Sequence, residues 1–180
     1  MVRTVRLSPF YGEMQPRRGT LTAETLLREE TAVDSFTEWA QGAEPRLRRA
    51  LTASFGPQVG TEAAAYALAY VWERWDRVGV RDNPLGYAYV VGRNKARRIT
   101  LRRRPLFPDL GQQRLPHVEP GLPAAIARLT EKQRIAVTLV YGYDWTMSEV
   151  AELLGTRKTT VQNHAERGLA RLRRALGVDS

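Results

Sequence analysis

TMSEVAELLGTRKTTVQNHAERGLARLRRAL, residues 146–176, decides the fold of this chain, because its pattern is typical of a helix-turn-helix whose second helix is basic. Thr146, with Glu149 three residues later, predicts a capping box at the start of the first helix. Gly155 stands where that helix must end in a residue that tolerates the left-handed conformation. One apolar stripe then runs along the second helix, made of Val161, Ala165, Gly168, Leu169, Leu172 and Leu176.

The opposite side of the second helix is polar and cationic, which is typical of a helix that reads base edges and phosphates in a major groove. Its side chains are Thr160, Gln162, Asn163, His164, Arg167, Arg171 and Arg174. The alternative is an ordinary amphipathic hairpin with a solvated basic face. The coincidence of charge, small residues and helix caps favours DNA binding over that alternative.

Composition indicates a folded protein with a polyanionic partner. The chain has 180 residues, a formal net charge of +9 and 43% hydrophobic residues. The positive net charge alone would also be compatible with binding to an anionic membrane surface. However, no apolar run approaches the roughly 20 residues of a spanning helix. The N-terminus also lacks the apolar core of a signal peptide. We therefore expect a cytoplasmic protein without a membrane partner.

An enzyme is poorly supported by the residues present. The chain contains no cysteine, which excludes disulfides, thiolate zinc sites and cysteine nucleophiles. Its two histidines, His117 and His164, have no carboxylate spaced for a metal site or a catalytic triad. No phosphate-binding or dinucleotide-binding glycine pattern is present. We expect no catalytic residue, no metal and no cofactor.

The pattern along the chain predicts an all-α protein with two small helical domains on a Pro-rich linker. Residues 1–32 are expected to form a mobile leader, with a short helix near residues 23–30. In the first domain, residues 33–104, we expect a helix from Asp34 that Pro45 kinks or divides. Further helices are expected at residues 61–75 and from Pro84, capped by Asn83, to about residue 103. A loop at residues 76–83 separates them.

The second domain is expected at residues 122–180. Between the domains, residues 105–121 hold four prolines among glycine and glutamine, which favours an extended linker. A short helix should run from Leu122 to Leu129. Thr130 and Gln133 predict a second capping box, which opens a helix ending near residues 141–142.

The end of the helix that begins at Pro84 carries a dense basic cluster without any acidic residue. Such like charges repel one another on one helix, so the cluster indicates contact with phosphates, although a solvated face is the alternative. The cluster comprises Arg93, Lys95, Arg97, Arg98, Arg102, Arg103 and Arg104. Nearby rings could stack on unpaired bases. The rings are Trp72, Trp75, Tyr87 and Tyr89. Trp72 and Tyr89 fit the apolar stripes and are interpreted as core residues. For Trp75 and Tyr87, the sequence does not decide between a core position and stacking on bases.

With these features in order, the chain resembles the extracytoplasmic-function class of bacterial sigma factors. The segment LTEKQRIAVTLVYGYDWTMSEVAELLG, with Thr160, Val161 and Arg167 following it, is similar to the family's pattern in its minus-thirty-five domain. YVWERWDRV and NPLGYAYVVGRNKARRITLRRR are similar to its minus-ten segments. The resemblance covers about residues 33–176. It implies promoter DNA and core RNA polymerase as partners, with an anti-sigma factor as a further one.

The resemblance implies a role for each cluster of residues. The minus-thirty-five element would be contacted by Lys158, Thr160, Gln162, Asn163, His164, Arg167 and Arg171. The minus-ten element would be held by Tyr87, Arg93, Asn94, Arg97 and Arg98, and the loop 76–83 would border a flipped base. The helix 61–75 would dock on the polymerase clamp through Glu62, Tyr66, Tyr70 and Glu73.

Two functions follow. The first is a sigma factor that binds core RNA polymerase and directs promoter recognition and transcription initiation. The alternative is a sigma-like DNA-binding regulator with weakened or lost polymerase engagement. Ala65 and Tyr66 motivate it, because the family usually carries an acidic cluster at this place.

Overall fold

The computed structural model describes residues 23–102 and 121–178, and every regular element in these ranges is a helix. This confirms the predicted all-α class. We call residues 23–102 the first unit and residues 121–178 the second unit. The first unit contains α1 (Ala23–Phe55), α2 (Pro57–Trp72), α3 (Trp75–Val78) and α4 (Pro84–Arg102). The second contains α5 (Leu122–Ala127), α6 (Glu131–Val137), the π-helix η1 (Thr138–Gly142), α7 (Met147–Leu154) and α8 (Lys158–Leu176).

The first helix is longer and more continuous than its sequence predicts. It begins at Ala23, within the expected leader, and Pro45 lies inside it without dividing it. The proline removes a single backbone hydrogen bond. Ala43 and Leu47 on either side of it are buried, so packing against the bundle holds the helix together across the proline. Pro45 therefore does not divide this helix, which was one of the two outcomes predicted for it, the other being a kink.

The second helix begins four residues earlier than expected, at Pro57 instead of Thr61. Gly56, with φ of +82°, makes the turn from α1, and Pro57 is preset for a first helical position. Gly60 lies inside α2 at the crossing of this helix with α1. A Cβ on Gly60 would stand 2.5 Å from the backbone N and Cα of Thr52. The absence of a side chain is what lets the two backbones approach.

The remaining helix signals are confirmed. Asn83 caps α4, since its Oδ1 accepts a hydrogen bond of 2.6 Å from the Gly86 N–H. The capping boxes at Thr130 and Thr146 are both formed, with Gln133 and Glu149 as the reciprocal partners. Gly155 ends α7 with φ of +60°. The predicted stripe on α8 faces inward, with buried Val161, Ala165, Gly168 and Leu172.

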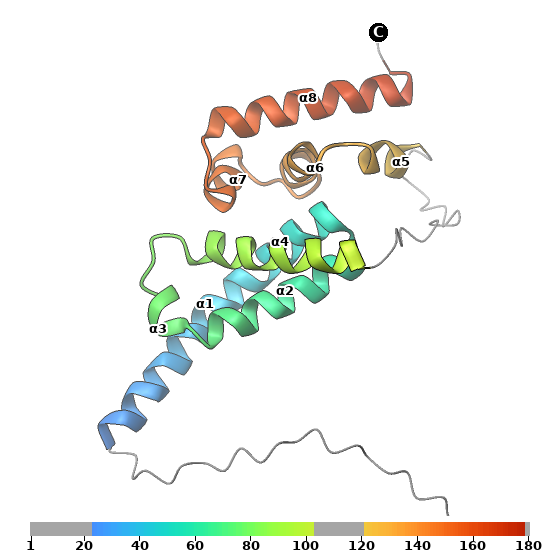
Figure 1. Cartoon of the computed structure of the whole chain (residues 1–180). Coiled ribbons are helices and arrows are strands. Elements are labelled where there is room, and N and C mark those ends of the chain that lie inside the picture. The colour runs from blue at the N-terminus through green and yellow to red at the C-terminus, as the bar shows by residue number, and fades with distance from the viewer. Residues whose placement is uncertain (1–22, 103–120, 179–180) are drawn as a thin grey trace, which may run out of the picture.

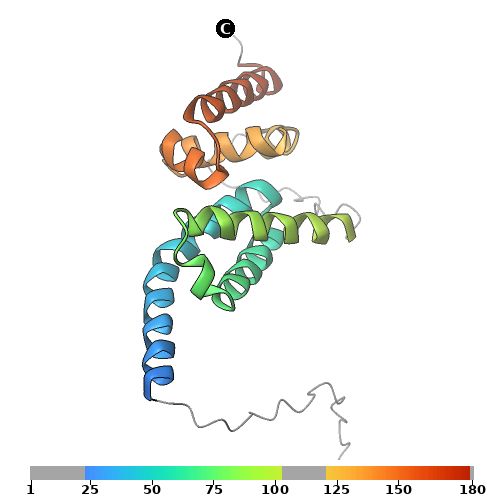
Figure 2. The same cartoon turned by 60° about the vertical axis from the view of Figure 1, so that its left-hand side comes forward.

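The two units lie against each other in successive layers of helices (Figure 1). In the second unit, α8 packs across α6 and α7, and α6, η1 and α7 face α1 and α4 of the first unit. Buried residues of both units, among them Leu47 and Leu51 on α1 and Ile135 and Leu139 beside them, belong to one continuous apolar cluster. The N-terminal part of α1 projects beyond this packed body (Figure 2).

No helix of the described residues is both long and apolar enough to cross a membrane.

Candidate nucleic-acid interface

The outward face of α8 carries the first set of candidate residues. Lys158, Gln162, Asn163 and Arg167 are exposed, and Thr160 and His164 are half-buried. The apolar stripe fixes which side of the helix faces inward, so these side chains are distributed around the remainder of the helix surface. Arg171 is exposed, but it also donates a hydrogen bond of 2.9 Å to the Oε1 of Gln133.

Neighbouring residues in the second unit fix the orientation of Gln162 and the protonation state of His164 on this face. The Gln162 amide donates to the Glu166 carboxylate at 2.8 Å, which orients the amide along the helix. Burial lowers the pKa of His164, and the nearby cations Lys132 and Arg167 lower it further. The imidazole is therefore neutral at neutral pH, and it offers one donor and one acceptor rather than a charge.

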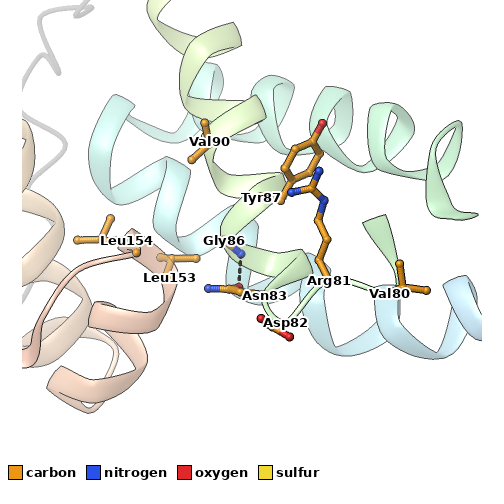
Figure 3. Close-up of a pocket in the computed structure, with 10 residues that line it drawn as sticks. Val80, Arg81, Asp82, Asn83, Gly86, Tyr87, Val90, Leu153 and Leu154 are labelled. Carbon is orange, nitrogen blue, oxygen red and sulfur yellow. Dashed lines mark hydrogen bonds between the residues drawn. The ribbon is translucent and has the colours of Figure 1, made fainter. Parts of the chain in front are cut away.

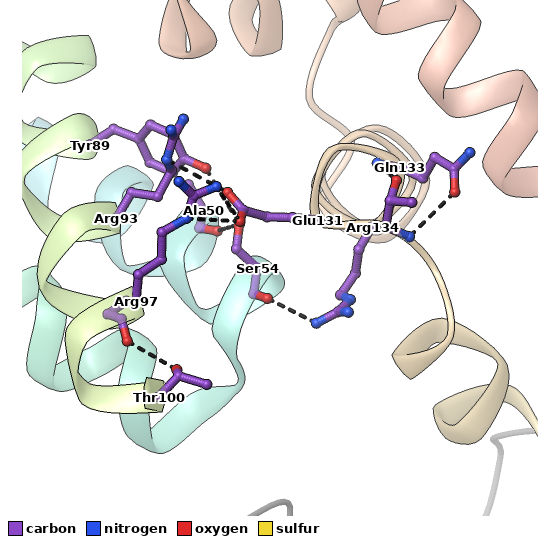
Figure 4. A network of polar contacts seen from close by, with 11 residues as sticks. Ala50, Ser54, Tyr89, Arg93, Arg97, Thr100, Glu131, Gln133 and Arg134 are labelled. Atoms are coloured by element: carbon purple, nitrogen blue, oxygen red, sulfur yellow. Dashed lines mark hydrogen bonds and ion pairs between the residues drawn. The ribbon is translucent and has the colours of Figure 1, made fainter. Parts of the chain in front are cut away.

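The second set of candidates lies on α4. Asn94, Arg97 and Arg98 are exposed, and Arg93 is half-buried. Arg93 and Arg97 both point toward Glu131 at the start of α6 (Figure 4). Arg102 is exposed at the end of α4, whereas residues 103 and 104 of the predicted basic cluster lie outside the described residues.

Tyr87, the remaining minus-ten candidate, belongs to a pocket at the start of α4 (Figure 3). The Arg81 guanidinium lies 4.7 Å from the centre of the Tyr87 ring. The cavity has a volume of about 540 Å³. Its wall is formed by the loop at residues 80–83 and α4 on one side, and by Leu153, Leu154 and Gly155 of the second unit on the other. The expected loop at residues 76–83 is shorter, since α3 extends to Val78.

Of the two aromatic residues predicted to be core, the structure confirms Tyr89 and contradicts Trp72. Tyr89 is 2% exposed and thus part of the core, as predicted, and burial raises the pKa of its hydroxyl. Trp72 is 43% exposed, so its prediction as a core residue is wrong. Its ring is tilted against that of Phe36 of α1, with 4.9 Å between the ring centres. Trp75, left open by the sequence, is half-buried there and donates to the Ser35 hydroxyl at 2.8 Å.

The polymerase-binding candidates lie on the outward side of α2. Glu62 and Tyr66 are exposed, Tyr70 is half-buried, and Glu73 is exposed and pairs with Arg74 at 2.8 Å. Each tyrosine ring is covered by a cation, which the sequence interpretation missed. Arg74 lies 3.8 Å from the ring centre of Tyr70, and Lys95 of α4 lies 4.7 Å from that of Tyr66. The spacing of four between Tyr70 and Arg74 could have indicated the first contact.

Two comparisons with known proteins find similarity to sigma factors. Residues 121–172 match the family model described as Sigma-70, region 4. The sigma factor RpoE from Bartonella quintana, solved in complex with the anti-sigma factor NepR, has the same fold with a TM-score of 0.55 and 18% sequence identity. The match covers 81% of this chain and 98% of that chain. No curated protein sequence matches the chain.

The second unit is therefore a sigma region 4 domain, and the described chain has the fold of a sigma factor.

Proposed function

We propose that this chain is a sigma factor that binds core RNA polymerase, recognises a bipartite promoter and directs transcription initiation. The observation that carries the proposal is the region 4 match over residues 121–172, whose last helix, α8, presents a polar and basic face to solvent. A two-domain division at residues 33–104 and 122–180, joined by residues 105–121, supplies one domain for each promoter element. The catalytic chemistry then belongs to the polymerase, and the site of action is the cytoplasm.

Each face of the molecule takes one role in this proposal. Lys158, Thr160, Gln162, Asn163, His164, Arg167 and Arg171 contact the minus-thirty-five element. Tyr87, Arg93, Asn94, Arg97 and Arg98 contact the minus-ten element. The α2 side chains Glu62, Tyr66, Tyr70 and Glu73 contact the polymerase. An anti-sigma factor is a further partner, by analogy with RpoE, which was solved with NepR.

The second candidate function is a sigma-like DNA-binding regulator that does not engage the polymerase productively. The observation that favours it is the exposed pair Ala65 and Tyr66 on α2, where carboxylates would give charge complementarity to a cationic clamp. The cation–π contact between Lys95 and Tyr66 makes this part of α2 aromatic and cationic. The two functions differ in whether polymerase binding accompanies DNA binding.

Run-off transcription with purified core polymerase distinguishes the two functions. We expect the full chain to form a complex with core enzyme in pull-down and to produce discrete transcripts from a panel of promoters of its own genome. DNA binding with neither core binding nor transcript would establish the regulator instead. A Tyr66→Ala variant tests the α2 face, since it should weaken core binding while leaving DNA binding by the second unit unchanged.

Arg167 tests the role of α8 in DNA binding. Its replacement by Ala should weaken binding to a promoter fragment because Arg167 is exposed on the DNA-facing side of the helix. A bidentate base contact would be worth about 1–3 kcal/mol and would relax preference at one position. A phosphate contact would weaken all sequences evenly and lower the salt slope by about one. Fluorescence anisotropy over a salt series separates these results, and an unchanged affinity would remove Arg167 from the interface.

A further inference from the structure

The close crossing of α6 and α8 brings one arginine of α8 onto a buried side chain of α6. Gly168 of α8 lies at this crossing, where a Cβ would stand 2.6 Å from Val137 Cγ2 and 3.5 Å from the Cβ of Gln133. Because glycine has no side chain, α8 can pass this close to α6. One turn further along α8, the Nη1 of Arg171 donates a hydrogen bond of 2.9 Å to the Oε1 of Gln133.

Gln133 is itself held in place by the capping box of α6. Its Oε1 also accepts from the Thr130 N–H at 3.3 Å, and its own N–H donates to the Thr130 hydroxyl at 3.4 Å. The residue is only 6% exposed. A side chain that is buried to this degree acts on a ligand through the exposed arginine that it holds. Gln133 therefore offers Arg171 an acceptor whose position is fixed by the start of α6.

The partner of Arg171 is a neutral amide rather than a carboxylate. A carboxylate would neutralise the guanidinium group, whereas an amide oxygen orients it and leaves its positive charge intact. A guanidinium group carries five N–H donors in a rigid fork, and the amide occupies one of them. The donors that remain can meet two oxygens of one phosphate group. Because the side chain is already oriented, it loses less conformational entropy when it binds an anion.

The position of Arg171 along α8 favours a phosphate over a base as its ligand. A recognition helix contacts base edges through its N-terminal residues. Arg171 follows Lys158, the first residue of α8, by thirteen positions, which is about 20 Å along the axis at about 1.5 Å per residue. The major groove is about 12 Å wide. When the first turns of α8 enter the groove, Arg171 therefore lies near the phosphate backbone at its edge.

We propose that Gln133 is a positioning residue for DNA binding, which holds Arg171 against a backbone phosphate beside the minus-thirty-five element. This inference rests on the proposed function for the identity of the DNA element, but the contact between Gln133 and Arg171 does not. A phosphate contact carries no sequence information of its own, yet it fixes the register of a protein on the duplex. Gln133 thus determines which base pairs the first turns of α8 can reach, although it contacts none of them.

The test measures binding of the full chain to two labelled duplexes of equal length, one from a promoter of its own genome and one of unrelated sequence. Gln133→Met removes the acceptor while keeping a side chain of similar length. We expect the affinity for both duplexes to fall about three- to tenfold, and the salt slope to fall by about one. Arg171→Gln should give the same result. The double substitution should bind no more weakly than Arg171→Gln alone, because both changes remove one contact.

Two further variants separate this role from the part that Gln133 plays in the capping box. Thr130→Ala removes the hydroxyl cap of α6 but leaves the Gln133 Oε1 available to Arg171. It should lower the melting temperature and leave the salt slope unchanged. Gln133→Glu keeps an acceptor for both the Thr130 N–H and Arg171, but it adds a negative charge that neutralises the guanidinium group. It should retain the melting temperature and lower the affinity for both duplexes.

Three results would overturn the positioning role of Gln133. They are an unchanged salt slope in Gln133→Met, additive losses in the double variant, and a Thr130→Ala protein that loses affinity and salt slope to the same extent as Gln133→Met. Failure of the proposed function would be seen separately. Absence of core binding and of run-off transcripts, with the effect of Gln133→Met on duplex binding intact, would overturn the assignment as a sigma factor alone. An unsubstituted chain that binds neither duplex would overturn both.

Discussion

Replacing Gly60 by Ala is expected to lower the free energy of unfolding by about 1–3 kcal/mol, a large loss for a single added methyl group. The new Cβ would stand 2.5 Å from the backbone N and Cα of Thr52. These atoms belong to α1 and cannot turn away as a side chain can. The two helices would have to separate along their crossing, which opens the core around Leu51 and Ala63. Thermal and denaturant unfolding measure the loss.

Gly42→Ala is the matched control for this experiment. Gly42 also lies inside α1, but it is exposed and a Cβ there would meet nothing within 4 Å. Alanine in place of glycine within an exposed helix should stabilise the protein by up to about 1 kcal/mol. Opposite signs for the two substitutions would show that the crossing, and not helix propensity, requires Gly60. A stabilised Gly60→Ala variant would contradict the close approach of α1 and α2.

Replacing Val161 by Asp is expected to have the largest effect on the second unit. Val161 is fully buried at the start of α8, where the helix-turn-helix packs together. An unpaired carboxylate at this position should cost about 3–5 kcal/mol, because water is excluded from a fully buried side chain. That loss is a large part of the stability of a small domain. We expect α8 to leave its place and promoter-fragment binding to be lost together.

Ala170→Asp separates the effect of burial from the effect of charge. It adds the same carboxylate to the same helix at an exposed position. The control should change the melting temperature little, and it should retain most of its DNA binding. Circular dichroism melts and anisotropy titrations of both variants provide the comparison. A Val161→Asp protein that melts like the control would mean that α8 does not pack through this stripe.

Much of the helical structure was predictable because its signals are local. A capping box relates residues three positions apart, as in Thr130 with Gln133 and Thr146 with Glu149. The apolar stripe of α8 repeats every three or four residues, so it reports the buried side of that helix directly. The exposure of Gln162, Asn163 and Arg167 follows from the same repeat. The resemblance to the minus-thirty-five domain was likewise visible in local sequence, in residues 129–155 followed by Thr160, Val161 and Arg167.

The errors arose where distant packing outweighs a local signal. Pro45 is a helix breaker by its own chemistry, yet α1 continues through it because buried residues on both sides pack on the bundle. Trp72 fits an apolar stripe, but among the described residues its side chain stays 43% exposed. Gly60 carries no local signal of its role, because it marks a helix crossing that only the packing of α2 on α1 creates. For Pro45 and Gly60, the deciding neighbours lie on other helices.

By itself, the sequence determined the helices, their caps and the basic faces of α4 and α8, because each depends on spacings within a few turns of one helix. It also determined the sigma-like order of the segments. Only the tertiary structure decided what those faces meet. Arg93 and Arg97 look like free cations in the sequence, and Glu131 looks like an ordinary first-turn carboxylate. They meet because α6 packs against the first unit, across a separation of 34 residues between Arg97 and Glu131. Such a contact depends on where two separately formed helices come to rest, and no local spacing encodes it.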